Sequence, residues 1–166
     1  ARVVTVASIA HRGTRGLALD DLHWQQQPYK KGEAYARSKL ANLLFSFELA
    51  RRLQRAASPV LSIAAHPGYS ATNIVGAVAS ESWFKRMGVQ IGNALIAQPA
   101  QQGSWPTLYA AAMPDVQSGS YYGPHGLMQF RGYPVPVKAN ANACNQATAA
   151  ALWGLSEQLT GVCALP

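Results

Sequence analysis

Two strand-like segments around one long amphipathic segment constrain the fold of this chain more than any other feature. Residues Arg2–Ala7 are β-branched and apolar and end in small residues, and Val60–Ala65 has the same character. Between them, Glu33 to about Arg55 carries apolar residues at helical spacing, and Ser58-Pro59 stops the pattern. Strand, crossover helix and strand form a βαβ unit with a right-handed connection. The pattern predicts an α/β fold built on a doubly wound parallel sheet.

The rest of the chain predicts shorter elements. Turn residues favour a loop over His11–Gly32, from which Leu17, Leu19, Leu22 and Trp24 are expected to contact the body of the protein. The remaining expectations are one or two helices within Tyr69–Pro99, a helix over Ala100–Met113, a short strand over Gly119–Gly123, a loop over Gly126–Pro136 and a final helix over Asn142–Gln158.

The first strand raises a question about its neighbours. Arg2–Ala7 is apolar enough to predict burial on both faces, and such a strand needs parallel partners on both edges. The later strands Val60–Ala65 and Ser120–Tyr122 are expected on one side only. A natural N-terminus seldom begins inside a buried strand, and there is no initiator Met. We therefore expect an upstream half that covers the other edge.

Composition narrows the class of protein. The chain has 166 residues, 49% of them hydrophobic and 13% charged, which suits one globular domain. It has no apolar run of the roughly 20 residues that a membrane span takes. The net charge of +7 comes from scattered cations, and Arg51, Arg52 and Arg55 are expected at a solvated helix end. No aromatic residues interleave with them, so nucleic acid is not an expected partner.

The two cysteines, Cys144 and Cys163, lack the spacing of a metal site or a redox motif. They fit a reduced, cytoplasmic protein better than a disulfide framework. The four histidines are widely spaced, and no metal-ligand cluster is evident.

Tyr35 and Lys39 are the residues that best indicate chemistry. They open the long helix, and residues four apart on a helix lie one above the other. A cation beside a phenol favours the phenolate, which can pass a proton to or from a substrate oxygen. Ser8 closes the strand upstream, and Pro67-Gly68 follows the next strand. The set points to redox chemistry between carbonyl and alcohol.

At these residues the chain resembles the short-chain dehydrogenase/reductase (SDR) family, in particular its retinol-dehydrogenase-like branch, with its Rossmann-like fold. The segments that match are Arg2–Ser8, Tyr35–Asn42, His66–Thr72, Gln101–Gly103 and Tyr121–Pro124. The resemblance covers nearly the whole chain, but the C-terminal half or so of a family member. It implies NADP or NAD as cofactor and a small-molecule alcohol, aldehyde or ketone as substrate. The resemblance to this branch further suggests an apolar substrate, such as a retinoid-like, steroid-like or lipid aldehyde. It also implies a homo-oligomer.

The same resemblance assigns roles to single residues. Ser8 hydrogen-bonds the substrate oxygen, Tyr35 is the acid/base, and Lys39 holds the nicotinamide ribose and supports the tyrosinate. Pro67 and Gly68 pack beside the nicotinamide ring, and Thr72 contacts the carboxamide or phosphate region. The glycine-rich turn of the family, which would hold the pyrophosphate, has no counterpart upstream of Ser8.

Three other interpretations stay open. In the first, the chain is a non-catalytic remnant that keeps the second half of the fold and binds no dinucleotide. Alternatively, Gly68-Tyr69-Ser70-Ala71-Thr72 resembles a nucleophile elbow and makes Ser70 the nucleophile of a serine hydrolase, although Thr72 stands where that motif has glycine. At the level of single residues, His66 is interpreted as a structural residue that caps a strand end rather than as a general base.

Overall fold

The computed structural model describes residues 1–69, 98–163 and 165. One four-stranded sheet organises them, with the strands in the order β1-β2-β3-β4. The strands are β1 (Arg2–Val6), β2 (Leu61–Ala65), β3 (Tyr121–Pro124) and β4 (Pro134–Pro136). The first three run parallel, and β4 runs antiparallel to β3. The predicted α/β, Rossmann-like class is confirmed, with a mixed sheet in place of an all-parallel one.

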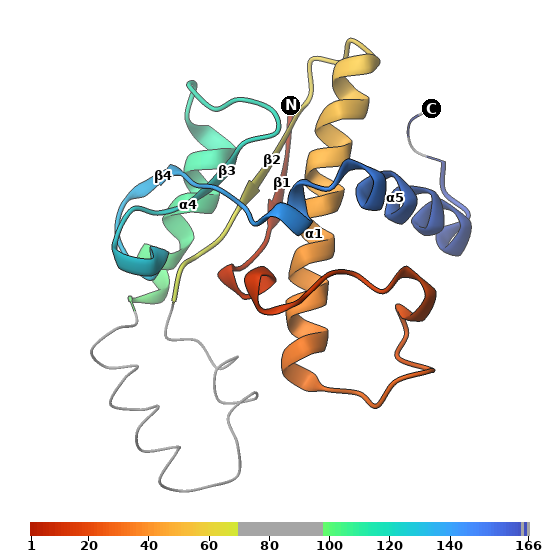
Figure 1. Cartoon of the computed structure of the whole chain (residues 1–166). Helices are drawn as coiled ribbons and strands as arrows, with labels where there is room; N and C mark the ends of the chain where they lie inside the picture. The colour runs from red at the N-terminus through yellow and green to blue at the C-terminus, as the bar shows by residue number, and fades with distance from the viewer. Residues whose placement is uncertain (70–97, 164, 166) are drawn as a thin grey trace, which may run out of the picture.

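Helices cover both faces of this sheet (Figure 1). They are α1 (Lys31–Arg55), α4 (Ala100–Ala112) and α5 (Gln146–Thr160), and short 3₁₀ turns cover Ile9–Gly13, Leu19–Asp21, Leu127–Gln129 and Ala141–Cys144. Helix α1 packs on β1 and β2 and also carries α5 on its outer side, whereas α4 packs on the opposite face of the strands.

The alternation of side chains along β2 and β3 explains the two cores. Ala64 and Tyr121 point to the α1 side, where they join fully buried leucines of that helix, Leu40, Leu43 and Leu44. Ile63, Ala65 and Tyr122 point the other way and pack with Ala110 of α4. Successive strand residues face opposite sides of a sheet, so both faces of β2 are buried. The predicted βαβ unit is therefore confirmed, with α1 as its crossover helix.

Strand β1 departs from its predicted burial. It has β2 on one edge, and within residues 1–69, 98–163 and 165 no strand pairs with its other edge, as expected. Val3 and Val6 are 39% and 43% exposed, however. The prediction that this strand is buried on both faces is therefore wrong for those two side chains.

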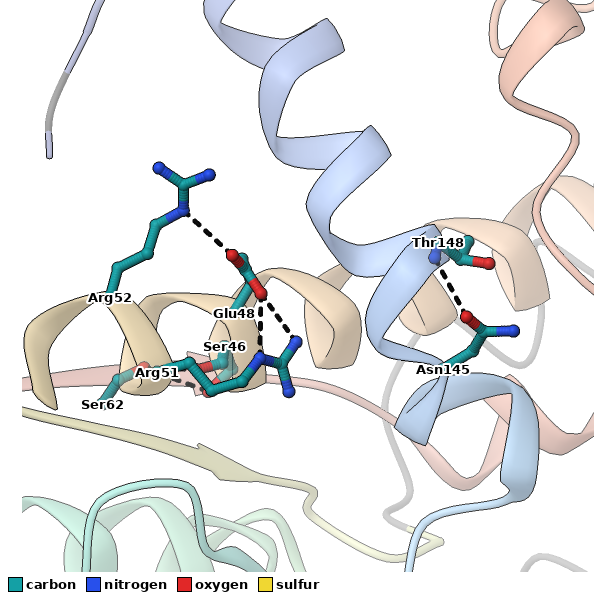
Figure 2. A network of polar contacts seen from close by, with 7 residues as sticks. All are labelled: Ser46, Glu48, Arg51, Arg52, Ser62, Asn145 and Thr148. Atoms are coloured by element: carbon teal, nitrogen blue, oxygen red, sulfur yellow. Dashed lines mark hydrogen bonds and ion pairs between the residues drawn. The ribbon is translucent and has the colours of Figure 1, made fainter. Parts of the chain in front are cut away.

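The expected loop over Gly126–Pro136 is also partly wrong, because it contains β4. Proline cannot donate to a sheet ladder, so Pro134-Val135-Pro136 does not read as a strand. β4 pairs with β3 alone in the described sheet, and an edge position tolerates missing donors. The final helix begins later than predicted because Asn145 caps it, its side-chain oxygen accepting the N–H of Thr148 at 3.0 Å (Figure 2).

The loop before α1 follows its prediction more closely. Leu17, Leu19 and Leu22 pack against the core cluster of α1, as expected. The Asp21 carboxylate, 4% exposed, accepts the backbone N–H groups of Gln25, Gln26 and Gln27. Those contacts fold the end of the loop back on itself ahead of α1.

The arginines near the end of α1 are held more firmly than predicted. Glu48, 2% exposed, accepts Nε–H of both Arg51 and Arg52, at 2.9 and 3.0 Å (Figure 2). The Arg52 guanidinium also lies 4.6 Å from the centre of the Trp153 ring on α5. The expectation of a solvated group is therefore wrong for Arg51 and Arg52 and holds for the exposed Arg55.

Candidate functional site

The ends of β1 and β2 form the base of the candidate site. Val6 of β1 pairs with Ala65 of β2, and the N–H of Ala7 donates to the Ala65 carbonyl at 2.8 Å. Ser8 and Pro67 therefore follow neighbouring strands at the same edge of the sheet. In open α/β sheets the carboxyl ends of parallel strands are where ligands bind.

Helix α1 brings Tyr35 and Lys39 to this edge. The Lys39 ammonium lies 5.6 Å from the centre of the Tyr35 ring, as their spacing on the helix predicts. It donates to the carbonyl oxygen of Val6 at 3.3 Å, and Asn42, about one turn further along α1, donates to the same oxygen at 3.0 Å. The structure thus places the Tyr35–Lys39 pair beside the strand end that leads into Ser8.

Ser8 is fixed by its own turn and by a histidine. Its Oγ accepts the N–H of Ala10 at 3.2 Å and so caps the following 3₁₀ turn. Its carbonyl oxygen lies 2.6 Å from Nδ1 of His11, and the other ring nitrogen, Nε2, accepts the N–H of Asn140 at 3.3 Å. Since a backbone N–H can only donate, Nδ1 carries the ring proton and donates it to Ser8.

His11 was not among the residues that the sequence singled out. It is fully buried, and burial lowers the pKa of its imidazole, which keeps the ring neutral. The signal in the sequence is its position one turn after Ser8, a spacing that lets a side chain reach back to a carbonyl. Taken alone, that spacing is too common to indicate a role.

The turn after β2 has a glycine where one is required. Gly68 has φ of +69°, a conformation that L side chains rarely adopt, and a Cβ there would lie 2.8 Å from Cγ of Pro124 and overlap the Phe130 carbonyl oxygen. Pro67 and Gly68 therefore form a tight turn directly after β2, and their expected contact with a nicotinamide ring stays a prediction. Thr72 and Ser70 lie outside the described residues, so the expected cofactor contact and the nucleophile-elbow interpretation stay predictions.

Three further features of the described residues concern metals, cysteines and membranes. In residues 1–69, 98–163 and 165, His, Cys, Asp and Glu do not gather into a group that could hold a metal ion. The cysteines Cys144 and Cys163 are free and exposed. Across the same part of the chain, none of the helices has the length and apolar character to cross a membrane.

Comparisons with known proteins identify the family. No protein-family model matches the chain. It is 32% identical to polyprenol dehydrogenase of Homo sapiens over 98% of its length and 46% of that protein, and 31% identical to human retinol dehydrogenase 14 over 97% and 44%. Human retinol dehydrogenase 13 is 32% identical over 97% of the chain and 46% of that protein. The chain spans about half the length of these curated relatives.

A solved structure agrees with the fold. The crystal structure of an uncharacterized protein from Mycobacterium Paratuberculosis superposes with a TM-score of 0.75, at 41% identity, over 99% of this chain and 52% of that one. Three findings indicate the same family: the order of the strands, the position of the Tyr35–Lys39 pair of α1 beside the end of β1, and the names of the relatives. The chain belongs to the short-chain dehydrogenase/reductase family, in its retinol-dehydrogenase-like branch.

Proposed function

We propose that this protein is an NADP- or NAD-dependent oxidoreductase that interconverts an alcohol with its aldehyde or ketone. The observation that carries the proposal is the contact of Lys39 with both the Tyr35 ring and the carbonyl oxygen of Val6. It puts a proton donor and a cation beside the strand end that continues into Ser8. Such a set suits a substrate oxygen that gains or loses a proton while its carbon is reduced or oxidised.

The residues at this edge fit a nicotinamide nucleotide. An ammonium has three donors, and the bond from Lys39 to Val6 leaves donors for the hydroxyls of a ribose. Gly68 has no Cβ, so the backbone of its turn can come close to a flat ring. Pro67 and Thr72 are the other contacts that the family resemblance implies. When bound, the nicotinamide supplies or accepts the hydride.

The proton is handled by this chain's own residues. In the reductive direction Tyr35 donates its hydroxyl proton to the substrate oxygen, and Lys39 stabilises the phenolate that remains. The Oγ of Ser8 already accepts the N–H of Ala10, and its own O–H can donate to the same substrate oxygen. In the oxidative direction each transfer is reversed.

The names of the relatives guide the choice of substrates. They are dehydrogenases named for polyprenol and for retinol, which are both long apolar alcohols. We therefore propose an apolar alcohol or aldehyde as the substrate class for this protein. A panel of retinoid, steroid and long-chain aliphatic alcohols, each offered with NADP and with NAD, tests that class.

Tyr35→Phe is the decisive variant because it keeps the ring and removes the proton. In the full-length natural protein we expect turnover to fall about 100-fold or more, with the thermal midpoint unchanged. The matched control is Tyr29→Phe, since Tyr29 is 65% exposed and lies in the loop before α1. Lys39→Ala should lower both the rate and the affinity for the dinucleotide, because one side chain serves both.

The outcome separates this proposal from the other interpretations. Wild-type turnover in Tyr35→Phe would refute the acid/base role. A wild-type protein that binds neither NADPH nor NADH would favour the non-catalytic remnant. Dinucleotide-independent ester hydrolysis that disappears in Ser70→Ala would favour the serine hydrolase.

A further inference from the structure

His66 is a buried histidine that the proposed chemistry does not use. It directly follows β2 and is fully buried. Its Nδ1 accepts the N–H of Gly68 at 3.1 Å, and its Nε2 lies 3.2 Å from the side-chain oxygen of Gln129. Because the N–H of Gly68 can only donate, Nδ1 is unprotonated and Nε2 carries the ring proton. The ring is thus held as one neutral tautomer.

The amide of Gln129 is oriented by a second donor. Nη2 of Arg12 donates to the same oxygen at 3.3 Å and to the carbonyl of Lys138 at 3.1 Å. A guanidinium has no acceptor, so the atom it meets on Gln129 is the oxygen. Gln129 has φ of +60°, an uncommon conformation for a residue with a side chain. Such backbone strain persists where the surroundings hold it in place.

Space for the His66 ring comes from Gly123 on β3. A Cβ at that position would overlap Nε2 of His66 and lie 2.8 Å from Cε1. The backbone of Gly123 is not in the left-handed region, so conformational freedom is not why glycine stands there. A close approach by another group is the usual alternative reason for a glycine within a strand. The absence of a Cβ at Gly123 therefore leaves room on β3 for the His66 ring.

The turn that His66 contacts is held from its other side as well. Gln98 donates from Nε2 to the carbonyl of Pro67 at 2.6 Å, and the N–H of Tyr69 donates to the carbonyl of Phe130 at 2.7 Å. The N–H of Gly132 in turn donates to the Gln98 side chain at 3.3 Å. Segment 126–132 therefore holds the turn on one side, directly and through Gln98, and His66 accepts the N–H of Gly68 on the other.

We propose that His66, backed by Gln129 and Arg12, is the positioning residue for the Pro67–Gly68 turn and sets the backbone shape that receives the nicotinamide end of the cofactor. The role of this turn toward the cofactor rests on the proposed function. Two features favour the neutral form of the ring: its burial, with the Tyr121 ring 5.2 Å away, and the positive charge of Arg12 nearby. A proton on Nδ1 would set donor against donor at Gly68 and open the turn.

Two substitutions separate the two ring nitrogens. In His66→Asn the side-chain oxygen can stand where Nδ1 stood, so the bond from Gly68 is kept. In His66→Gln the amide reaches the position of Nε2, so the contact with Gln129 is kept and the bond from Gly68 is lost. His23→Asn is the control, because His23 is an exposed histidine of the loop before α1.

The first measurement concerns the turn itself. In the full-length natural protein, ring ¹⁵N shifts should show His66 with a bare Nδ1 and a protonated Nε2. Exchange of the Gly68 amide should be about tenfold faster in His66→Gln than in wild type, and close to wild type in His66→Asn and His23→Asn. A protonated Nδ1 in wild type, or equal exchange in the two His66 variants, would overturn the proposal. If a variant does not fold, the ring ¹⁵N shifts of the wild-type protein still test which nitrogen of His66 carries the proton.

The second measurement concerns the ligand. His66→Gln should weaken NADPH or NADH binding about tenfold and leave unchanged the affinity for ADP or 2′,5′-ADP, which lack the nicotinamide. A purely structural role would weaken all four ligands together and so overturn the positioning role. A wild-type protein that binds no dinucleotide would instead overturn the proposed function, and the shifts and exchange rates would still judge His66.

Discussion

Gly68→Ala offers a stringent test of the candidate site, because the chain contains a matched glycine elsewhere. Gly68 and Gly161 have the same φ of +69°. Gly161 ends helix α5, and a Cβ there would meet nothing within 4 Å. At Gly68 a Cβ would overlap the Phe130 carbonyl oxygen and lie 2.8 Å from Pro124 and 3.0 Å from the carbonyl oxygen of Gln129. The two sites thus share the backbone strain and differ in the space around it.

The expected magnitudes follow from that difference. Placing a non-glycine residue in the left-handed region costs roughly 1 kcal/mol at either site. Overpacking adds about 1–3 kcal/mol at Gly68 alone, because the Phe130 carbonyl is held by the N–H of Tyr69 at 2.7 Å and cannot move aside cheaply. We therefore expect Gly68→Ala to lower the free energy of unfolding by about 2–4 kcal/mol and Gly161→Ala by about 1 kcal/mol.

Urea denaturation followed by circular dichroism measures both values, with the denaturant dependence checked for a change in slope. Equal losses at the two glycines would refute the close approach of Gly68 to segment 126–132. Cofactor affinity supplies an independent readout: Gly68→Ala should weaken dinucleotide binding, whereas Gly161→Ala, at the far end of α5, should not.

Two further predictions concern charge. Burial lowers the pKa of His66 from 6.5 to about 4, and it also lowers the pKa of His11. Between the unfolded and the folded pKa of His66, the unfolded chain therefore binds a proton that the folded protein does not. The free energy of unfolding should therefore fall as the solution is acidified, by about 2 kcal/mol for His66 between about pH 7 and about pH 5. Urea titrations should show that His66→Asn lacks this part of the pH dependence. An unchanged pH dependence in that variant would contradict the assignment. Glu48→Ala, which breaks both contacts drawn in Figure 2, should cost about 2 kcal/mol. This is less than for a fully buried pair, because the Arg51 and Arg52 side chains are 24% and 17% exposed and can regain water. The comparison Glu33→Ala removes a carboxylate that is 36% exposed and pairs with Arg37 alone, so it should cost about 1 kcal/mol or less, and equal losses would show that burial of Glu48 does not matter.

The parts of the fold that could be predicted from sequence are those encoded locally. Helical periodicity places α1 within two residues of its observed start, and the apolar segments place β1 and β2. Because α1 is regular, its spacing also places Lys39 against Tyr35. These features depend on neighbours along the chain, which the sequence shows directly.

The parts that escaped prediction depend on contacts between distant segments. Gly123 ends the short strand that the sequence predicts, but no pattern near it indicates that the His66 ring packs against it. The prolines of β4 argue against a strand, and only the edge position makes them acceptable. Helix spacing alone would pair Glu48 with Arg51 and Arg52, but it does not indicate that Arg52 also lies on the Trp153 ring of α5. No local pattern carries such information.

Two buried histidines connect these distant segments to the site. Past the ends of β1 and β2, backbone groups leave the sheet ladder and need other partners. His11 donates to the carbonyl of Ser8 and accepts from Asn140, whereas His66 accepts from Gly68 and meets Gln129. Each ring thus uses one nitrogen on a strand end and the other on a segment far along the chain.

The two rings hold opposite tautomers because the backbone groups they serve are opposite, a carbonyl in one case and an N–H in the other. Tyr121 lies between them, with ring centres 5.9 Å from His11 and 5.2 Å from His66, and its burial raises the pKa of its hydroxyl. A neutral ring pair around a neutral phenol costs less to bury than charged groups would. Segment 126–145 contributes none of the proposed catalytic residues, but through Gln129 and Asn140 it holds the two histidines that fix both strand ends of the proposed site.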